Sequence, residues 1–134
     1  MIVEKDLTYI NTCKNIAIFG SSGAIGSGFI DFFSTIPSVE TIYSFSRSSR
    51  PKTSKKNKHF HFDILDEHAI QNIALSIPKE VEFDIIIIAT GSLHIDNIMP
   101  EKSIRHYESE HAQLFYMINT VGPSLIMKYF YQIM

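Results

Sequence analysis

The sequence has 134 residues, of which 45% are hydrophobic and 19% are charged, and its formal net charge is −2. This composition predicts one globular domain and excludes a disordered or fibrous chain. A single cysteine excludes an internal disulfide and a cysteine-based zinc site, and the weakly acidic balance does not favour nucleic acid as a partner.

The first residues lack the basic-then-apolar order of a signal peptide, and no apolar run approaches the ~20 residues of a membrane span. We therefore expect a soluble, cytoplasmic protein with no membrane partner. His59 and His61 alternate on a predicted strand, but no third ligand follows at a suitable spacing, so we expect no metal site. We expect residues 1–134 to form a single domain, with residues 1–14 as an N-terminal extension.

The first third of the chain predicts a strand, a helix and a second strand. Residues 16–19 are a short apolar run of the kind found in buried strands. Residues 25–36 carry apolar side chains at spacings of three and four, which is typical of a helix, and Pro37 ends it. Residues 41–45 alternate and are rich in strand-favouring residues.

The remainder of the chain repeats this alternation. Residues 58–62 predict a short strand, and residues 66–77 predict a helix with Asp66 as its N-cap. Residues 83–89 contain four consecutive isoleucines, as expected of a parallel strand that is covered on both faces. The apolar stripe over residues 109–134 predicts a helix.

This order of elements predicts the fold class. Strands that alternate with helices form a parallel sheet with right-handed crossovers. We therefore expect an α/β fold with a truncated, Rossmann-type parallel sheet in strand order 3-2-1-4. The connection between residues 45 and 58 departs from the alternation, and we expect it to hold a short helix or none.

The first strand runs into a glycine-rich stretch, Gly20-Ser21-Ser22-Gly23-Ala24-Ile25-Gly26, which opens the first helix. A glycine loop between a strand and a helix is the context of a dinucleotide-binding fingerprint, in which amides at the helix N-terminus face the pyrophosphate. Gly20 suits the tight turn, Gly23 a close approach of the phosphates, and Gly26 close packing of the helix. The alternative is a glycine-rich turn with no ligand.

The end of the second strand indicates which dinucleotide binds. An NAD site usually has an acidic residue there, whereas this strand ends in Ser46 and Arg47, which suit a 2′-phosphate. No acidic residue lies between Glu40 and Asp63. We therefore expect NADP(H) to be favoured over NAD(H). Six of the 12 basic residues lie in this stretch, which could otherwise be a solvated loop: Arg47, Arg50, Lys52, Lys55, Lys56 and Lys58.

These segments resemble the short-chain dehydrogenase/reductase superfamily, most closely its C-factor-like (C-signal-like) branch, over residues 14–134. Besides the glycine loop and Ser46–Arg47, three further segments match in order: Phe62-Asp63-Ile64, Ile88-Ala89-Thr90-Gly91 and Asn119-Thr120-Val121-Gly122-Pro123. The resemblance implies that Asp63 and the next amide, of Ile64, face the adenine. It also implies that Ala89, Thr90 and Gly91 line the cofactor ribose.

The resemblance gives Asn119 a catalytic role, in which it holds a water-linked proton path. Asn119 could instead bond to the backbone locally, and Asp63 could cap a helix or form a loop turn. The family has Asn-Asn-Ala-Gly where this chain has Ile88-Ala89-Thr90-Gly91, so backbone contacts alone carry over there. His94 could be an ordinary loop residue, or it could face the substrate region.

The family's catalytic Ser and Tyr-x-x-x-Lys are absent from this sequence. We therefore expect the cofactor-binding N-terminal half of an oxidoreductase, inactive alone, that would take a small carbonyl substrate only with a C-terminal half. The alternatives are a non-catalytic regulatory or sensor module and a truncated gene product. The apolar stretch over residues 129–134 favours truncation. In the family the fourth helix lies at a dimer interface, so we expect self-association.

Overall fold

Parallel strands form the centre of the protein. In the computed structural model, the described residues 8–48 and 54–134 contain β1 (Asn15–Phe19), β2 (Thr41–Ser46), β3 (Asn57–His61) and β4 (Ile85–Ile88). These strands pair in parallel in the order β3-β2-β1-β4. The predicted fold class and strand order are therefore confirmed. The first seven residues of the expected N-terminal extension lie outside the described residues.

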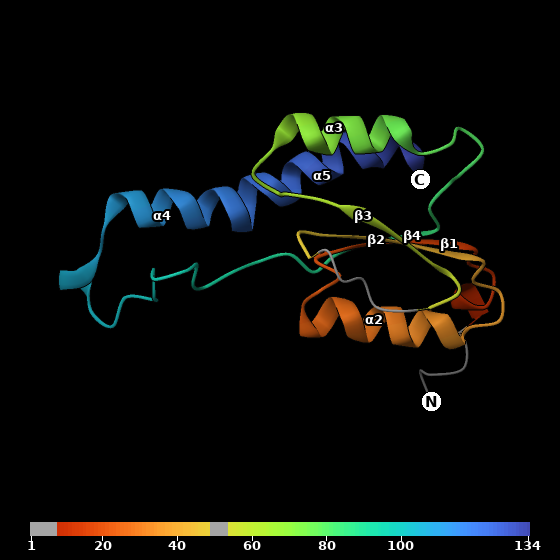
Figure 1. Cartoon of the computed structure of the whole chain (residues 1–134), viewed down its shortest axis with the longest axis horizontal. Coiled ribbons are helices and arrows are strands. Elements are labelled where there is room, and N and C mark those ends of the chain that lie inside the picture. Colours follow the sequence, from red (N-terminus) through yellow and green to blue (C-terminus); the bar gives the residue numbers. More distant parts are fainter. Residues whose placement is uncertain (1–7, 49–53) are drawn as a thin grey trace.

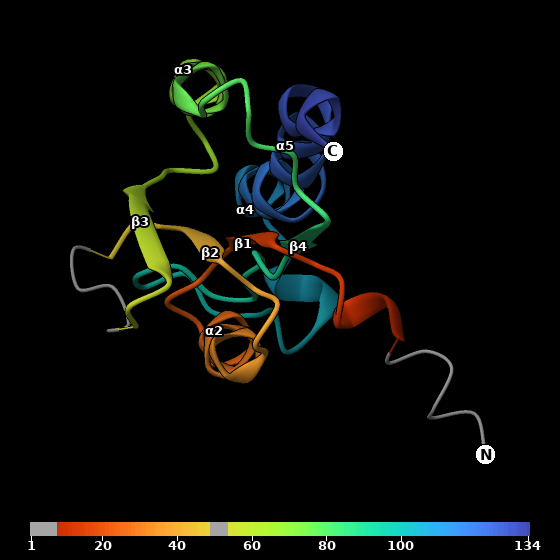
Figure 2. The ribbon, with the colours of Figure 1, turned by 90° about the vertical axis from the view of Figure 1, so that its right-hand side faces the viewer.

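Helices cover both faces of the sheet (Figures 1 and 2). Helix α2 (Ala24–Thr35) lies on one face, and α3 (Glu67–Ser76) and α5 (Gly122–Phe130) lie side by side on the other. Because side chains of a strand alternate between faces, β1 serves both layers. Its Ile18 packs into the cluster beneath α2, and its Phe19 packs into the cluster beneath α3 and α5.

Four phenylalanines form the centre of the larger cluster. Phe19 stacks on Phe45 with their ring centroids 4.3 Å apart, and it meets Phe62 and Phe130 edge to face at 5.4 and 4.8 Å. All four side chains are buried. Aromatic pairs in these arrangements each add about 0.5–1.5 kcal/mol beyond the burial of their area. This cluster joins β1, β2, the segment after β3 and α5.

The four isoleucines of β4 serve both faces, as their run predicts. Ile86 and Ile88 pack against the cluster beneath α3 and α5, whereas Ile85 and Ile87 pack against the cluster beneath α2. Each of them is only half-buried, because β4 is the last strand of the sheet within the described residues. The coverage on both faces is therefore present but incomplete.

The long C-terminal segment is helical, as predicted, but it is not one α-helix. Helix α4 (Ser109–Tyr116) continues into a π-helical segment, η2 (Met117–Val121), and then into α5 and a short 3₁₀ turn, η3 (Tyr131–Ile133). A π-helical turn inserts an extra residue, which the apolar periodicity does not reveal. Helix α4 and the preceding loop, which includes a 3₁₀ turn, η1 (Ile104–His106), extend away from the sheet (Figure 1).

Local capping at α3 also follows the sequence. The Asp66 carboxylate accepts a hydrogen bond from the Ala69 amide at 2.9 Å, so the predicted N-cap is confirmed.

No α-helix lies in the described residues of the connection between β2 and β3, and its residues 49–53, with the basic Arg50 and Lys52, lie outside the described part. In the described residues, no helix has the length and apolar character needed to cross a membrane.

Candidate functional site

A cavity of about 210 Å³ opens at the carboxyl edge of the sheet, where β1, β2 and β4 end. In parallel α/β sheets this edge is where ligands bind. Ten of the predicted site residues line the cavity: Gly20, Ser22, Gly23, Ser46, Arg47, Asp63, Ile64, Ala89, Thr90 and Gly91. Four segments that are distant in the sequence therefore meet at one place.

The glycine loop has the backbone that its residues predict. Gly20 has a φ of +78°, which L-residues with a side chain rarely adopt. A Cβ there would also lie 2.6 Å from the Ala89 carbonyl oxygen, so both the backbone conformation and the lack of space require glycine. A Cβ on Gly26 would strike the Gly20 carbonyl and lie 2.9 Å from Cα of Ser21. At Gly23 a Cβ would meet nothing of the chain closer than 3.4 Å, so packing alone does not require glycine there.

Helix α2 begins at the cavity without a side-chain cap. Its N-cap is Gly23, which has no side chain that could bond to the amides of the first turn. Those amides have no partner inside the helix, and they carry the positive end of its dipole. Ala24 and Ile25 lie exposed in this turn, whereas Ser21 is buried and its amide bonds to the Phe45 carbonyl. The arrangement suits an anion.

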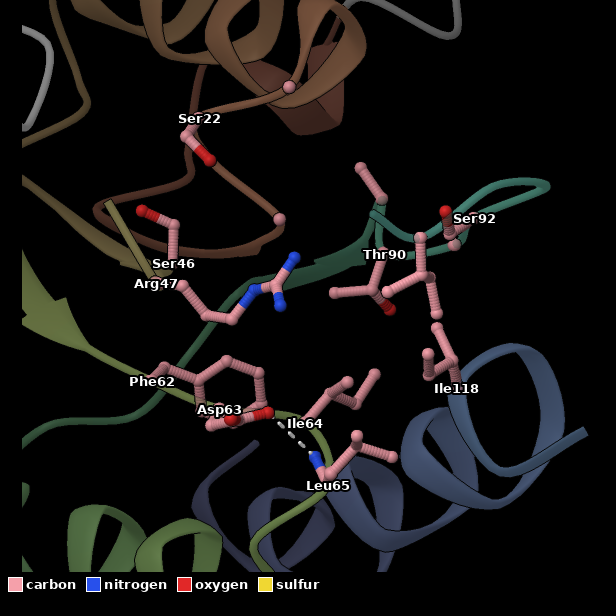
Figure 3. Close-up of a pocket in the computed structure, with 15 residues that line it drawn as sticks. Ser22, Ser46, Arg47, Phe62, Asp63, Ile64, Leu65, Thr90, Ser92 and Ile118 are labelled. Atoms are coloured by element: carbon pink, nitrogen blue, oxygen red, sulfur yellow. Dashed lines mark hydrogen bonds between the residues drawn. The ribbon is translucent and has the colours of Figure 1, made fainter. Parts of the chain in front are cut away.

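Two buried hydroxyls at the cavity lack a hydrogen-bond partner in the described part of the protein. They are Oγ of Ser46, a residue that is only 5% exposed, and Oγ1 of Thr90. A buried hydroxyl without a partner costs about 1–3 kcal/mol. Between these residues the Arg47 guanidinium reaches into the middle of the cavity (Figure 3). A ligand with acceptor oxygens would meet hydroxyl and guanidinium donors here.

Asp63 forms a loop turn at the cavity wall. One carboxylate oxygen accepts a hydrogen bond from the Leu65 amide at 3.0 Å, and the residue lines the cavity (Figure 3). Asp63 is not a helix cap, because Asp66 has that role. Ile64 lies tightly against Gly122 of α5, where any Cβ would strike the Ile64 side chain. This contact holds the segment after β3 in place beside the cavity.

The Asn119 side chain connects η2 to the loop after β4. Its Oδ1 accepts a hydrogen bond from the Ser92 amide, and its Nδ2 donates to the Ser92 carbonyl, both at 2.8 Å. Because Ser92 is 27 residues away, these bonds are tertiary, and they differ from the local backbone bond that was the alternative interpretation. Asn119 does not itself line the cavity, and its catalytic role stays a prediction.

The basic run does not gather at the cavity as a unit. Arg47 is its member that lines the cavity in the described residues. Lys56 donates to the Ile36 carbonyl at the C-terminal end of α2, 2.6 Å away, and Lys58 lies over the Tyr43 ring at 5.6 Å. Lys56 directly precedes β3 and Lys58 is its second residue, so both lie toward the end of the strand that is opposite the cavity. These two lysines therefore do not border the cavity.

Two of the histidines form hydrogen bonds within the chain. His59 bonds to Ser44 and to the Ser48 carbonyl, and His94 lies in the loop after β4, where its backbone bonds to the Ser92 hydroxyl. Among residues 8–48 and 54–134, no three His, Cys, Asp or Glu side chains form a group that could hold a metal ion.

The cavity also has an apolar wall that the sequence motifs did not identify, formed by Leu65, Ile95 and Ile118.

Comparisons with known proteins identify the fold. A crystal structure of an NADPH-bound carbonyl reductase from chicken superposes with a TM-score of 0.77 at 15% identity, over 90% of this chain and 48% of that one. A short-chain dehydrogenase family protein from Francisella tularensis gives 0.75 at 19%, over 90% and 46%. A short-chain dehydrogenase from Leptospira borgpetersenii with bound NAD⁺ gives 0.70 at 21%, over 90% and 46%.

These likenesses show that the chain shares its fold with part of these reductase and dehydrogenase structures. The chain spans about half the length of the solved structures that it matches. No protein-family model matches it. No curated protein matches it either.

Proposed function

We propose that this chain belongs to the short-chain dehydrogenase/reductase superfamily, in its C-factor-like branch, and that residues 1–134 are one NADP(H)-binding domain. In the complete enzyme this domain would serve hydride transfer between NADPH and a carbonyl or alcohol substrate. The single observation that carries the proposal is the cavity at the carboxyl edge of the sheet, where the glycine loop, the end of β2, the segment after β3 and the end of β4 meet.

The residues fit a dinucleotide phosphate by their chemistry. The uncapped amides of α2 and the open side of Gly23 would receive the pyrophosphate, with Ser21, Ser22, Ala24, Ile25, Gly20 and Gly26 forming the turn that presents them. The unpartnered Ser46 hydroxyl and the Arg47 guanidinium would receive a 2′-phosphate. Arg can bond two phosphate oxygens at once, which favours NADPH over NADH.

The other two segments would hold the nucleoside parts. Asp63 keeps a carboxylate at the cavity wall, and it and the Ile64 amide would face the adenine. Ala89, Thr90 and Gly91 would line the ribose, and the unpartnered Thr90 hydroxyl places a donor where the family segment Asn-Asn-Ala-Gly has alanine. The Leptospira structure contains NAD⁺ and the chicken structure NADPH, so the matched fold accepts both, and Arg47 carries the preference proposed here.

A bound nicotinamide would supply or accept the hydride. This chain would contribute binding and orientation, and Asn119 would position the loop after β4 through its two bonds to Ser92. No tyrosine in residues 1–134 is followed four residues later by lysine, so these residues offer no such acid/base pair. We therefore propose that residues 1–134 alone bind cofactor but do not turn over carbonyl compounds.

We also propose that the chain self-associates. Several large apolar side chains on or near α4 are exposed: Met99, Ile104, Tyr107, Tyr116 and Met117. Exposed apolar surface of this kind is typical of an interface. The proposal also rests on the resemblance, in which the fourth helix pairs two subunits.

Calorimetric titration of the chain with NADPH and with NADH tests the cofactor proposal. We expect tighter binding of NADPH, and we expect Arg47→Ala to weaken it by about 1–3 kcal/mol, the usual worth of a charged hydrogen bond. Lys58→Ala is the matched control, because it removes the same charge from a side chain that lies over Tyr43. Equal or tighter binding of NADH would overturn the proposal.

A further inference from the structure

A chain of two hydrogen bonds crosses from the interior of β2 to the loop that follows it. The Ser44 hydroxyl lies 3.0 Å from Nδ1 of His59, which stands opposite it on β3. Nε2 of the same ring lies 2.9 Å from the Ser48 carbonyl oxygen. Ser44 is fully buried, and His59 is partly buried. His59 therefore joins a fixed point in the core to the backbone just after Arg47.

The donor and acceptor properties of the groups determine where the protons lie in these two hydrogen bonds. A carbonyl oxygen only accepts, so Nε2 of His59 donates to Ser48. In the neutral ring Nδ1 then has a free lone pair, and it accepts from the Ser44 hydroxyl. Ser44 needs a partner because it sits in the core layer beneath α2, where an unpaired hydroxyl is costly. Both ring nitrogens are thereby used, and the ring cannot turn without breaking a bond.

This arrangement holds the backbone on both sides of Arg47. On one side, the Ser46 carbonyl accepts the Phe62 amide at 3.0 Å, which continues the sheet ladder. On the other side, the Ser48 carbonyl accepts from His59. Arg47 is exposed and borders the cavity, so its own side chain is held by little else that the structure describes. Its direction depends on the backbone that carries it.

We propose that His59 is a positioning residue for nucleotide selectivity: through Ser48 it orients Arg47 toward the 2′-phosphate of NADPH. The inference rests on the proposed function. A guanidinium bonds two phosphate oxygens only in a narrow range of orientations, and a backbone that is already ordered loses less entropy when the ligand binds. NADH lacks the 2′-phosphate, so its binding does not depend on this alignment.

Two substitutions of His59 separate its two bonds. In His59→Gln the amide nitrogen occupies about the place of Nε2 and can still donate to Ser48. In His59→Asn the amide reaches only the place of Nδ1, so the Ser48 bond is lost. We expect His59→Asn to weaken NADPH binding about tenfold, the worth of one such bond, and to leave NADH binding within about twofold. We expect His59→Gln, which keeps the Ser48 bond but loses the Ser44 bond, to weaken NADPH binding by no more than about threefold and to leave NADH binding unchanged.

A double-substitution cycle with Arg47→Ala then identifies the path of the effect. If His59 acts through Arg47, His59→Asn causes no further loss of NADPH affinity once Arg47 is replaced. Equal losses for NADPH and NADH, or additive losses in the cycle, would overturn the inference. Failure of Arg47→Ala to weaken NADPH binding would instead overturn the cofactor proposal, so the two failures are distinguishable.

Circular dichroism is used first to establish whether each variant is folded. If His59→Asn is unfolded, Ser44→Ala takes its place, because it leaves His59 able to reach Ser48 but removes the bond that fixes the ring. We expect Ser44→Ala to weaken NADPH binding about threefold, a part of the worth of the Ser48 bond, with NADH unchanged. Unchanged NADPH binding in a folded Ser44→Ala variant would then overturn the inference.

Discussion

Two glycines of α2 make a matched pair for testing the packing beneath the phosphate loop. Gly26 is buried, and a Cβ there would strike the Gly20 carbonyl oxygen and lie 2.8 Å from its carbon. Both atoms belong to the backbone, so neither can move aside as a flexible side chain would. Gly28 lies two residues further along the same helix, is exposed, and has nothing within 4 Å of a built Cβ.

The free energies of the two substitutions follow from these surroundings. Replacement of glycine by alanine inside a helix gains up to about 1 kcal/mol from helix propensity. At Gly26 this gain is opposed by overpacking against backbone, which costs about 2–3 kcal/mol at the upper end of the usual range. We therefore expect Gly26→Ala to destabilise the protein by about 1–2 kcal/mol and Gly28→Ala to stabilise it by up to about 1 kcal/mol.

Chemical denaturation followed by circular dichroism measures the difference directly. The free energies of unfolding of the two variants should differ by about 2–3 kcal/mol, which corresponds to roughly 10 °C between their melting temperatures. The m-values should agree, because neither change alters the surface exposed on unfolding. If Gly26→Ala proves as stable as Gly28→Ala, the close packing of α2 against the loop is refuted, and with it the geometry of the site.

Three further predictions test other parts of the structure. The carboxylate of Glu67 accepts hydrogen bonds from Lys128 and Tyr129, which lower its pKa below the usual 4.5. Its stabilising effect is present above pH 4.5 and is lost as the pH falls through the lower folded value, so Glu67→Gln should lower the melting temperature at pH 7 and have little effect near pH 2. An effect that is independent of pH would contradict this. Asn119→Ala should speed hydrogen exchange at the Ser92 amide by about tenfold, since it removes that amide's acceptor, and unchanged exchange in NMR spectra would contradict the bond. Sedimentation velocity should detect dimers or larger species at micromolar concentration, and a strictly monomeric chain would contradict the proposed self-association.

Much of the fold could be predicted because its signals are local. Alternation in β2, the isoleucine run of β4 and the Asp66 cap each depend on a few neighbouring residues, and each lies where the sequence places it. The 3-2-1-4 order is that of half a Rossmann-type sheet, which the alternation of strands and helices together with the glycine loop predicts. The tight turn at Gly20 also follows from local chemistry, since a left-handed φ favours glycine.

Other features depend on contacts between distant residues, which periodicity does not report. The π-helical turn η2 leaves no mark in the apolar periodicity, and the bond from the Ser92 amide to Asn119 joins residues that are 27 positions apart in the sequence. Lys56 is part of a basic run in the sequence, yet its ammonium caps α2 at the opposite end of the sheet from the cavity. Charge clustering along the chain therefore overstated the positive charge at the site, and it gave no sign of the role of His59.

The proposed function requires that a dinucleotide binds at the carboxyl edge of the sheet. A second cavity, about 580 Å³ in volume, lies between α3 and α5, so binding at the first cavity is not the only possible outcome. NMR spectra of the labelled chain during titration with NADPH distinguish the two sites. We expect amide signals to shift at residues 20–26, 46–47, 63–64 and 89–91 and to remain in place around Leu75 and Gln132. Shifts confined to the α3–α5 cavity, or no shifts at all, would contradict it.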